Sequence, residues 1–214
     1  MAKDKRRIAQ NRARKKARQA IRKKQKQQQT DARGRFARMG CTRGELSRSP
    51  IHAAYVGDSV FSQGIGHALI SRELTDGRIA AGVFLVDAYC LGVKDAFLMV
   101  QSAIEFHDTL EHRFMKNDLK TVTPAYAAKL VHGAVAYARD LGFDPHPDYR
   151  DASVVLGDID PDECDETFTF GKDGKPFYFA GPHDSHGMAQ RIATQLHNRC
   201  GPDGAHYAVR GGGS

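Results

Sequence analysis

The sequence predicts an α+β domain in which two β-hairpins build an antiparallel sheet with helices packed on it, preceded by a basic helical or disordered N-terminal arm. Two hairpin patterns separated by helical periodicity predict the sheet and its helices. A concentration of positive charge in the first fifty residues predicts the arm. The expected organisation is a basic nucleic-acid-binding arm over residues 1–38, a linker over 39–50 and an acidic globular domain over 51–214.

The first hairpin is predicted by two strand-like runs. These are HALISREL, residues 67–74, and RIAAGVFLVDAY, residues 78–89. The Asp-Gly pair in the turn at 75–77 is a typical hairpin signal. The second run is apolar on both faces of its period-two alternation, which indicates a central strand covered on two sides.

Helices are expected after this hairpin. Asp95 suits the N-cap of a first helix over residues 96–114, because its carboxylate can accept a backbone N–H at the positive end of the helix. The apolar stripe of that helix consists of Met99, Ala103, Phe106, Leu110 and Phe114. A second helix is predicted over 123–142, since it opens with Thr-Pro and ends at a glycine. A short helix is expected over 149–156.

The second hairpin is predicted from TFTF at 167–170 and PFYFA at 176–180, with a turn around 172–174 between them. A helix over 184–201 follows, which begins with Asp-Ser and stops at a glycine. The run AHYAV at 205–209 predicts a last short strand. A parallel dinucleotide-binding sheet is excluded, because no GxGxxG motif follows a strand.

Charge divides the chain into two parts. Residues 1–50 contain 18 Lys and Arg against 3 Asp and Glu, a net charge of +15. Residues 51–214 contain 14 against 22, a net charge of −8. The arm is rich in good helix formers but has only a thin apolar stripe, so we expect it to be disordered alone and helical against a polyanion.

This charge pattern predicts that the arm binds nucleic acid by neutralising phosphates. RNA is favoured over DNA because arginine-rich segments commonly fold on RNA. The arm has no aromatic residue before Phe36, so base stacking is not expected. We expect it to contact the nucleic-acid backbone and to respond to the shape of the nucleic acid, with little base specificity. The expected contact residues are Arg6, Arg7, Arg12, Arg14, Lys15, Lys16, Arg18, Arg22, Lys23 and Lys24. Two alternatives stay open: the arm binds an acidic protein or its own acidic body, or it is a targeting signal.

An enzymatic alternative rests on Asp87, the one acid in the most apolar segment. His107 and Glu111 are four residues apart and share a helical face, so they are candidates to meet Asp87 at the sheet. Two carboxylates and an imidazole suit a divalent ion that activates water, as in a metal-dependent hydrolase or nuclease. The structural alternative is that backbone donors, Arg72 or Lys94 satisfy Asp87, because an unpaired buried carboxylate costs several kcal/mol.

Three further motifs have residue types that suggest a calcium-binding loop, a phosphate-binding or catalytic turn, and a base-stacking surface. The segment Gly157–Glu166 resembles the start of an EF-hand loop, but Glu163 stands at the glycine position and Thr169 at the final glutamate position, which favours a solvated acidic loop. The segment GPHDSHG, with His183 and His186, has the composition of a phosphate-binding or catalytic turn, or of a polar loop before a helix.

The third motif is a set of aromatic residues in the second hairpin. They are candidates to stack bases if one face of the hairpin is open, although core packing is the preferred interpretation. The set consists of Phe168, Phe170, Phe177, Tyr178 and Phe179.

Signals for membrane insertion, secretion and cofactor binding are lacking. No run of about 18 apolar residues is present, which excludes a membrane association through a spanning helix, and no apolar region follows the basic N-terminus to form a secretory signal. The four cysteines, Cys41, Cys90, Cys164 and Cys200, form no CxxC pair, which argues against zinc and disulfides. The sequence therefore predicts a cytoplasmic, RNA-binding accessory protein of a nucleoprotein assembly that needs no cofactor, with a protein partner on its acidic body. Whether it is an enzyme stays open, with a preference for none.

Overall fold

The structure is a computed structural model that describes residues 34–114, 119–181 and 184–208. The chain divides into two compact units, Met1–Gly44 and Glu45–Ser214. Among the described residues, every strand belongs to the second unit. The stretch 39–50 expected to be a linker contains a short helix, α2 (Arg43–Leu46).

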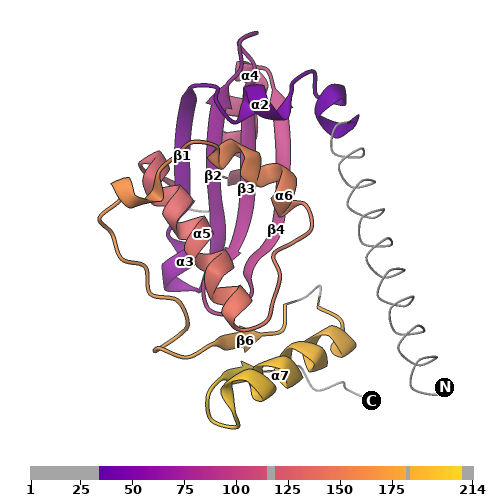
Figure 1. Cartoon of the computed structure of the whole chain (residues 1–214), viewed down its shortest axis with the longest axis vertical. Helices are drawn as coiled ribbons and strands as arrows, with labels where there is room; N and C mark the ends of the chain where they lie inside the picture. The colour runs from indigo at the N-terminus through magenta and orange to yellow at the C-terminus, as the bar shows by residue number, and fades with distance from the viewer. Residues whose placement is uncertain (1–33, 115–118, 182–183, 209–214) are drawn as a thin grey trace, which may run out of the picture. The chain divides into compact units, whose positions relative to one another are not determined.

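A five-stranded antiparallel sheet forms the centre of the second unit, in the order β4-β3-β2-β1-β5 (Figure 1). The strands are β1 (Ile51–Gly57), β2 (Ile65–Glu73), β3 (Ile79–Asp87), β4 (Gly92–Gln101) and β5 (Leu119–Thr121). The predicted α+β class with an antiparallel sheet is confirmed. Strands β1 and β5 were not predicted, because neither has a hairpin turn beside it in the sequence.

The β2–β3 hairpin forms where the sequence predicts it. Its register runs from Ile65↔Asp87 to Glu73↔Ile79 without a bulge. The turn closes through a hydrogen bond from Leu74 N–H to Arg78 O, and Gly77 adopts the left-handed conformation with φ 79°. Strand β3 lies between β2 and β4 and is buried over most of its length, which confirms the expectation of a central strand.

Residues 92–101 form strand β4, so the prediction that Asp95 caps a helix is wrong. Gly92, with φ 66°, turns the chain back so that β4 pairs with β3. The true N-cap is Ser102, which forms a capping box with Glu105 and starts α4 (Ala103–Thr109). The buried stripe residues Phe106, Leu110 and Phe114 lie on α4 and the π-helix that follows it, η1 (Leu110–Phe114). The apolar residues of β4 and α4 fit one continuous helical stripe, so the apolar pattern does not mark the boundary between the strand and the helix.

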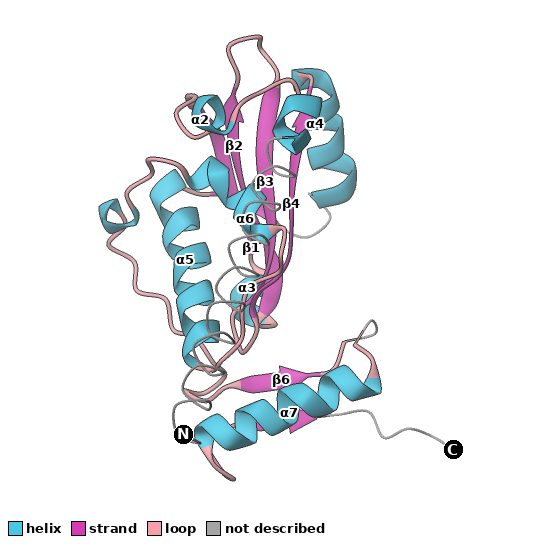
Figure 2. Ribbon diagram, turned by 45° about the vertical axis from the view of Figure 1, so that its right-hand side comes forward, coloured by secondary structure: helices cyan, strands magenta, loops and turns pink. Residues whose placement is uncertain are grey.

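Helices cover both faces of the sheet (Figure 2). One face carries α5 (Pro124–Asp140), α6 (Tyr149–Ala152) and the 3-10 helix η3 (Ser153–Leu156), all close to their predicted positions. The contact is tight, because a Cβ on Gly82 of β3 would lie 2.7 Å from the carbonyl oxygen of Ala152. On the other face, Leu69 and Val83 pack with Leu110 and Phe114.

The predicted second hairpin forms only at its turn, where Lys172 and Lys175 exchange two backbone hydrogen bonds (2.8 and 3.0 Å), and its flanking strands do not pair. Residues 167–170 are in no strand, and β6 (Phe177–Phe179) instead pairs in parallel with β7 (His206–Ala208). The physical reason is the packing of two aromatic side chains. Phe168 packs between Phe61 and Tyr126, and Phe170 stacks on Tyr137.

Helix α7 (His186–Cys200) covers the β6–β7 pair and confirms the predicted C-terminal helix. Its N-cap is Ser185, and Gly201 ends it. The small core beneath α7 includes Tyr178, Ile192 and Leu196, and it reaches Cys90 and Leu91 of the turn between β3 and β4. That core therefore joins the C-terminal segment to the sheet.

Candidate functional site

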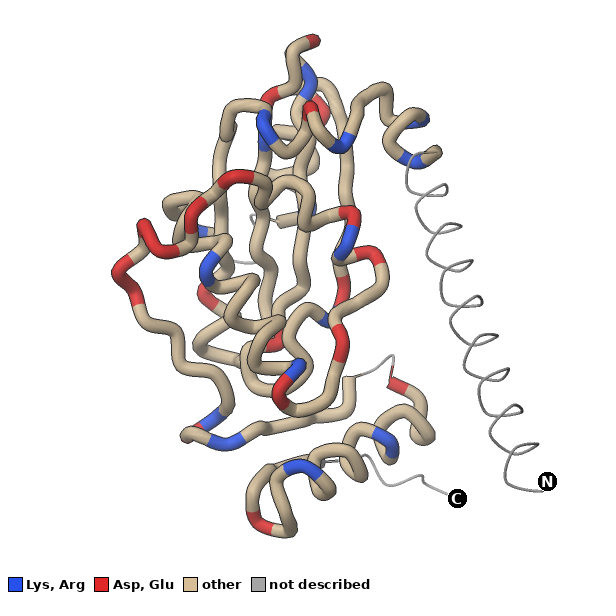
Figure 3. The backbone as a smooth tube through the Cα atoms, in the orientation of Figure 1, with Lys and Arg blue, Asp and Glu red and all other residues tan. Residues whose placement is uncertain are grey.

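The residues predicted to bind nucleic acid lie outside the described part of the chain. All ten arm residues, from Arg6 to Lys24, precede residue 34. Figure 3 shows the acidic and basic residues of the described chain, which are distributed over the sheet, its helices and the C-terminal segment. The arm therefore stays a prediction from charge.

Asp87 lies at the last position of β3 and closes the turn to β4. Its Oδ1 accepts hydrogen bonds from the N–H groups of Tyr89 (3.0 Å) and Cys90 (2.9 Å). Burial raises the pKa of Asp87 to about 6, although these turn hydrogen bonds and the charge of Lys94 act in the opposite direction. The structural alternative for Asp87, satisfaction by backbone donors, is thus what the structure shows.

The structure does not bring Asp87 together with His107 and Glu111. Asp87 pairs with Gly92, whereas α4 starts after Gln101, which pairs with Ile79 at the other end of β3. Eight residues of strand separate these ends, about 26 Å at the usual rise. His107 and Glu111 are also exposed, because Phe106, Leu110 and Phe114 take the sheet-facing positions.

A metal site therefore has no geometric basis at these three residues. Within the described ranges, no group of three or more His, Cys, Asp or Glu side chains is placed to hold a metal ion. His107 instead lies beside two rings, with its centroid 6.1 Å from that of His52 and 6.0 Å from that of Phe106.

A buried polar cluster that sequence reasoning missed surrounds Asp184, just before α7. The Oδ2 atom of Asp184 accepts hydrogen bonds from Lys94 Nζ (2.9 Å), Tyr178 OH (3.0 Å) and Gly181 N–H (2.9 Å). The Asp184 side chain is only 4% exposed. Burial tends to raise the pKa of Asp184, but the bonds from Lys94 and Gly181 outweigh it and hold the pKa below its ordinary value. Burial, followed by the bond to Asp184, raises the pKa of Tyr178.

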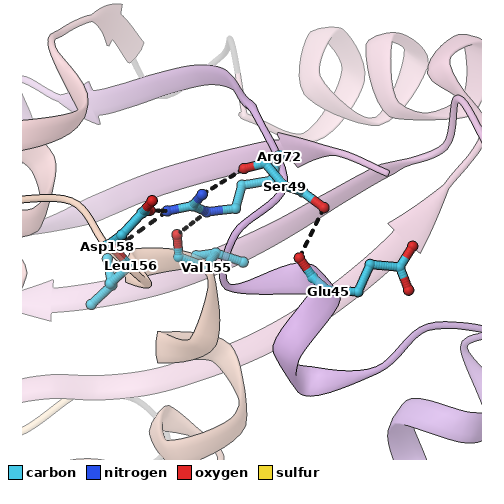
Figure 4. A network of polar contacts seen from close by, with 6 residues as sticks. All are labelled: Glu45, Ser49, Arg72, Val155, Leu156 and Asp158. Atoms are coloured by element: carbon cyan, nitrogen blue, oxygen red, sulfur yellow. Dashed lines mark hydrogen bonds and ion pairs between the residues drawn. The ribbon is translucent and has the colours of Figure 1, made fainter. Parts of the chain in front are cut away.

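A second polar network centres on Arg72, whose side chain is buried within β2 (Figure 4). Its guanidinium donates to Val155 O (2.6 Å), to Ser49 O (2.5 Å) and to Asp158 Oδ1 (2.8 Å). The network extends through Ser49, whose hydroxyl donates to Glu45 O (3.0 Å). Arg72 therefore joins the sheet to the segment that precedes β1, to η3 and to the residues that follow η3.

Two carboxylates of the acidic segment Gly157–Glu166 take part in structural contacts. Asp158 pairs with Arg72, and this hydrogen bond holds the pKa of Asp158 below its ordinary value. Asp160 caps the 3-10 helix η4 (Pro161–Glu163) by accepting from Asp162 N–H (2.9 Å). The outer carboxylates, Asp162, Glu163, Asp165 and Glu166, are exposed.

The segment GPHDSHG has a structural role where it is described, at the start of α7. Ser185 accepts from Met188 N–H as the N-cap of α7, and His186 is the first, exposed residue of that helix. His183 lies outside the described residues.

The aromatic set predicted for the second hairpin forms no common stacking face. Phe168 and Phe170 pack toward α5, against Tyr126 and Tyr137. Tyr178 is 1% exposed, and Phe179 is exposed. The interpretation of the set as a base-stacking platform is therefore not supported by its geometry, and packing accounts for most of its members.

Comparison with known proteins gives no functional lead. No family model, curated protein or solved structure matches the chain significantly. Among the residues that the structure describes, no helix combines the length and apolarity needed to cross a membrane. The polar clusters around Asp87, Asp184 and Arg72 are thus accounted for by structural contacts.

Proposed function

We propose that this protein binds RNA through its basic arm, as an accessory component of a nucleoprotein assembly. The observation that carries the proposal is the net charge of +15 over residues 1–50, against −8 over the remaining chain. Such a separation of charge favours contact of the arm with phosphates and release of their counterions. RNA is preferred to DNA because arginine-rich segments often fold on structured RNA.

The contacts of the body support this assignment to the arm. Many basic side chains of the body interact within the body itself and are therefore less suited to hold phosphates. The ion pairs are Arg72–Asp158, Arg78–Asp76, Lys94–Asp184, Lys120–Asp58 and Arg150–Asp151. Lys129, Lys175 and Arg199 donate to backbone carbonyls.

The exposed carboxylates of the acidic segment favour a different kind of partner on the body. Asp162, Glu163, Asp165 and Glu166 are exposed next to one another in the chain. Because like charges repel phosphates, this surface is proposed to face a basic protein surface and not the RNA. The arm and the body would then have separate partners in one assembly.

The test is binding of the full chain to a structured RNA and to duplex DNA of equal length, measured by fluorescence anisotropy over a salt series. If the ten arm residues contact phosphates, the logarithm of the affinity should fall with the logarithm of salt with a slope of about −7 to −9. Replacing the ten with Gln should remove most binding. A control variant with Gln at four exposed basic residues of the body, Arg139, Lys172, Arg191 and Arg199, should bind as the wild type does.

The outcomes separate the alternatives. Retained binding in the arm variant contradicts the proposal, as does a flat salt dependence. Equal affinity for RNA and DNA leaves the arm as a nucleic-acid-binding segment but contradicts the preference for RNA. If neither polyanion binds, small-angle scattering at low and high salt tests docking of the arm on the body, because a screened arm should extend.

A further inference from the structure

The segment DETFTF, residues 165–170, is a stretch of backbone without hydrogen-bond partners. It belongs to no strand and leads from η4 toward β6 as an extended trace (Figure 1). Among the described residues, none of its N–H or C=O groups forms a hydrogen bond. The bonds on either side belong to Cys164, whose C=O accepts from Lys129, and to Gly171, whose N–H donates to Ala88 O (2.9 Å). Such a row of unpaired groups is a template for another extended chain.

This segment has the side-chain pattern of a strand. The half-buried Phe168 and Phe170 alternate with the exposed Thr167 and Thr169. Both phenylalanines are held by tyrosines of α5, with ring centroids 4.8 and 5.6 Å apart. A Cβ on Gly133 of α5 would lie 2.8 Å from the Phe170 ring, so the packing is close. The segment is thus ordered before any partner arrives, which lowers the entropy cost of pairing.

The charge of this region decides which kind of chain can pair with it. Residues 157–171 contain six Asp and Glu and no Lys or Arg. Asp165 and Glu166 are exposed on the segment itself, and Figure 3 shows the acidic positions along this part of the chain. Because like charges repel, nucleic acid and acidic peptides are disfavoured here, and a peptide that carries Lys and Arg is attracted.

An exposed ring beside the segment also suits a cationic partner. Phe61 of α3 (Ser59–Ser62) is 40% exposed and stacks on Phe168, with ring centroids 5.7 Å apart. Glu166 lies near this cluster, because its charge, after burial, raises the pKa of Tyr126. A guanidinium or ammonium group over the Phe61 ring would therefore find both an aromatic face and a nearby carboxylate.

We propose that residues 165–170 bind an extended, Lys- and Arg-bearing segment of a protein partner, which adds to them as a β-strand. Backbone hydrogen bonds supply the pairing, as in other cases of strand addition. The carboxylates select the charge of the partner, and Phe61 receives one of its cationic side chains. The inference rests on the protein partner proposed above for the acidic surface and does not depend on RNA binding by the arm.

Binding of synthetic peptides to the full chain tests the mode of recognition by fluorescence anisotropy. The probe is a short peptide that alternates Val with Lys and Arg. A second peptide has the same side chains with every backbone nitrogen methylated, so it keeps the charge but lacks hydrogen-bond donors. It should bind at least about tenfold more weakly, since two lost hydrogen bonds account for such a ratio. A third peptide, with Glu in place of Lys and Arg, should not bind.

Two charge-matched variants of the full chain test the location. Asp165→Asn combined with Glu166→Gln should weaken binding of the probe by about fivefold, as expected for two exposed charges. The matched control is Asp140→Asn combined with Asp144→Asn, which removes two exposed carboxylates outside the segment and should leave the affinity unchanged. Circular dichroism checks that both variants are folded.

Several results would overturn the proposal. No detectable binding of the probe, or equal affinity for the probe and its methylated form, rejects strand addition. Equal losses in the two charge-matched variants would show general attraction to an acidic protein. Binding only to a full chain with Gln at the ten arm residues would show that the arm itself takes the place of a partner. In each case the RNA titration is read separately, so persistent RNA binding leaves the function of the arm intact.

Discussion

The ammonium of Lys94 lies 2.9 Å from the Asp184 carboxylate, and this pair connects β4 to the start of α7. Ninety residues separate the two in the chain. Both side chains are largely withdrawn from solvent, at 22% and 4% exposure. Because Tyr178 and Gly181 donate to the same oxygen, the carboxylate has the hydrogen bonds that a buried charge requires.

Removing one partner of this pair should be more harmful than removing both. Lys94→Met leaves the Asp184 carboxylate buried without its cation, and we expect a loss of about 2–4 kcal/mol in the free energy of unfolding near neutral pH. Asp184→Asn should cost less, since an amide oxygen still accepts from Tyr178 and Gly181. Urea unfolding of the two single variants and the double variant measures the coupling, and additive effects would contradict a direct interaction.

This pair also predicts a dependence of stability on pH. The pKa of Asp184 is lowered in the folded protein, so its contribution is present above the ordinary pKa of 3.8 and is lost as the pH falls below that value. The difference in stability between wild type and Asp184→Asn should therefore shrink in acid. A difference that is constant with pH would contradict the ionised state assigned to Asp184.

Asp87 should show the opposite dependence. Its pKa in the folded protein is about 6, above the ordinary 3.8, so the folded state binds the proton more tightly. The stabilisation is complete below the ordinary pKa and is lost as the pH rises through about 6, by at most about 3 kcal/mol. Asn at position 87 keeps an oxygen for the N–H groups of Tyr89 and Cys90.

We therefore expect Asp87→Asn to be more stable than the wild type at about pH 8, with a smaller difference at about pH 5. Urea unfolding at both pH values measures this. A variant that is less stable at the higher pH would show that the carboxylate charge supports the fold.

Arg72 is predicted to be the most sensitive basic residue of the body. Arg72→Met leaves the carbonyl oxygens of Val155 and Ser49 without this donor in a buried site, so we expect a loss of about 3–5 kcal/mol. Arg78→Met is the matched control, because the Arg78–Asp76 pair lies at the surface and should contribute less than about 1 kcal/mol. Similar effects of the two substitutions on the thermal midpoint would contradict the role of the network.

Two glycines should respond to alanine in opposite directions. A Cβ on Gly82 would lie 2.6 Å from a methyl group of Val155 and 2.7 Å from the carbonyl of Ala152, so Gly82→Ala should separate the sheet from the helices and destabilise the fold. Gly187, in the first turn of α7, has nothing within 4 Å of that position. Gly187→Ala should therefore stabilise the protein by up to about 1 kcal/mol. Thermal unfolding of both variants checks the contrast.

Local signals explain which parts of the fold were predictable. The Asp-Gly turn of the β2–β3 hairpin, the Thr-Pro start of α5 and the Ser185 cap of α7 act within a few residues, and the structure contains all three. The sequence predicts a helix where β4 forms, because Asp95 resembles an N-cap and the apolar residues that follow it fit both the helix and the strand period. The capping box of Ser102 and Glu105 was the signal that marks the true boundary.

Contacts between distant segments could not be predicted from local patterns. The strand partner of β6 is β7, nearly thirty residues later, and the TFTF segment is held by rings of α5 and not by a ladder. The same applies to the candidate sites. Asp87, His107 and Glu111 suit a metal ion by residue type, but the register of β3 and β4 places them at opposite ends of the sheet.

The distant acceptors of Arg72 have a consequence for folding during synthesis. Val155 and Asp158 follow Arg72 by 83 and 86 positions. A nascent chain that has not yet reached Val155 can form the β2–β3 hairpin from neighbouring residues, but its guanidinium lacks these oxygens and must stay hydrated. During synthesis, the Arg72 side chain of the hairpin therefore stays hydrated until Val155 and Asp158 have left the ribosome, and closure of so long a loop adds a further delay.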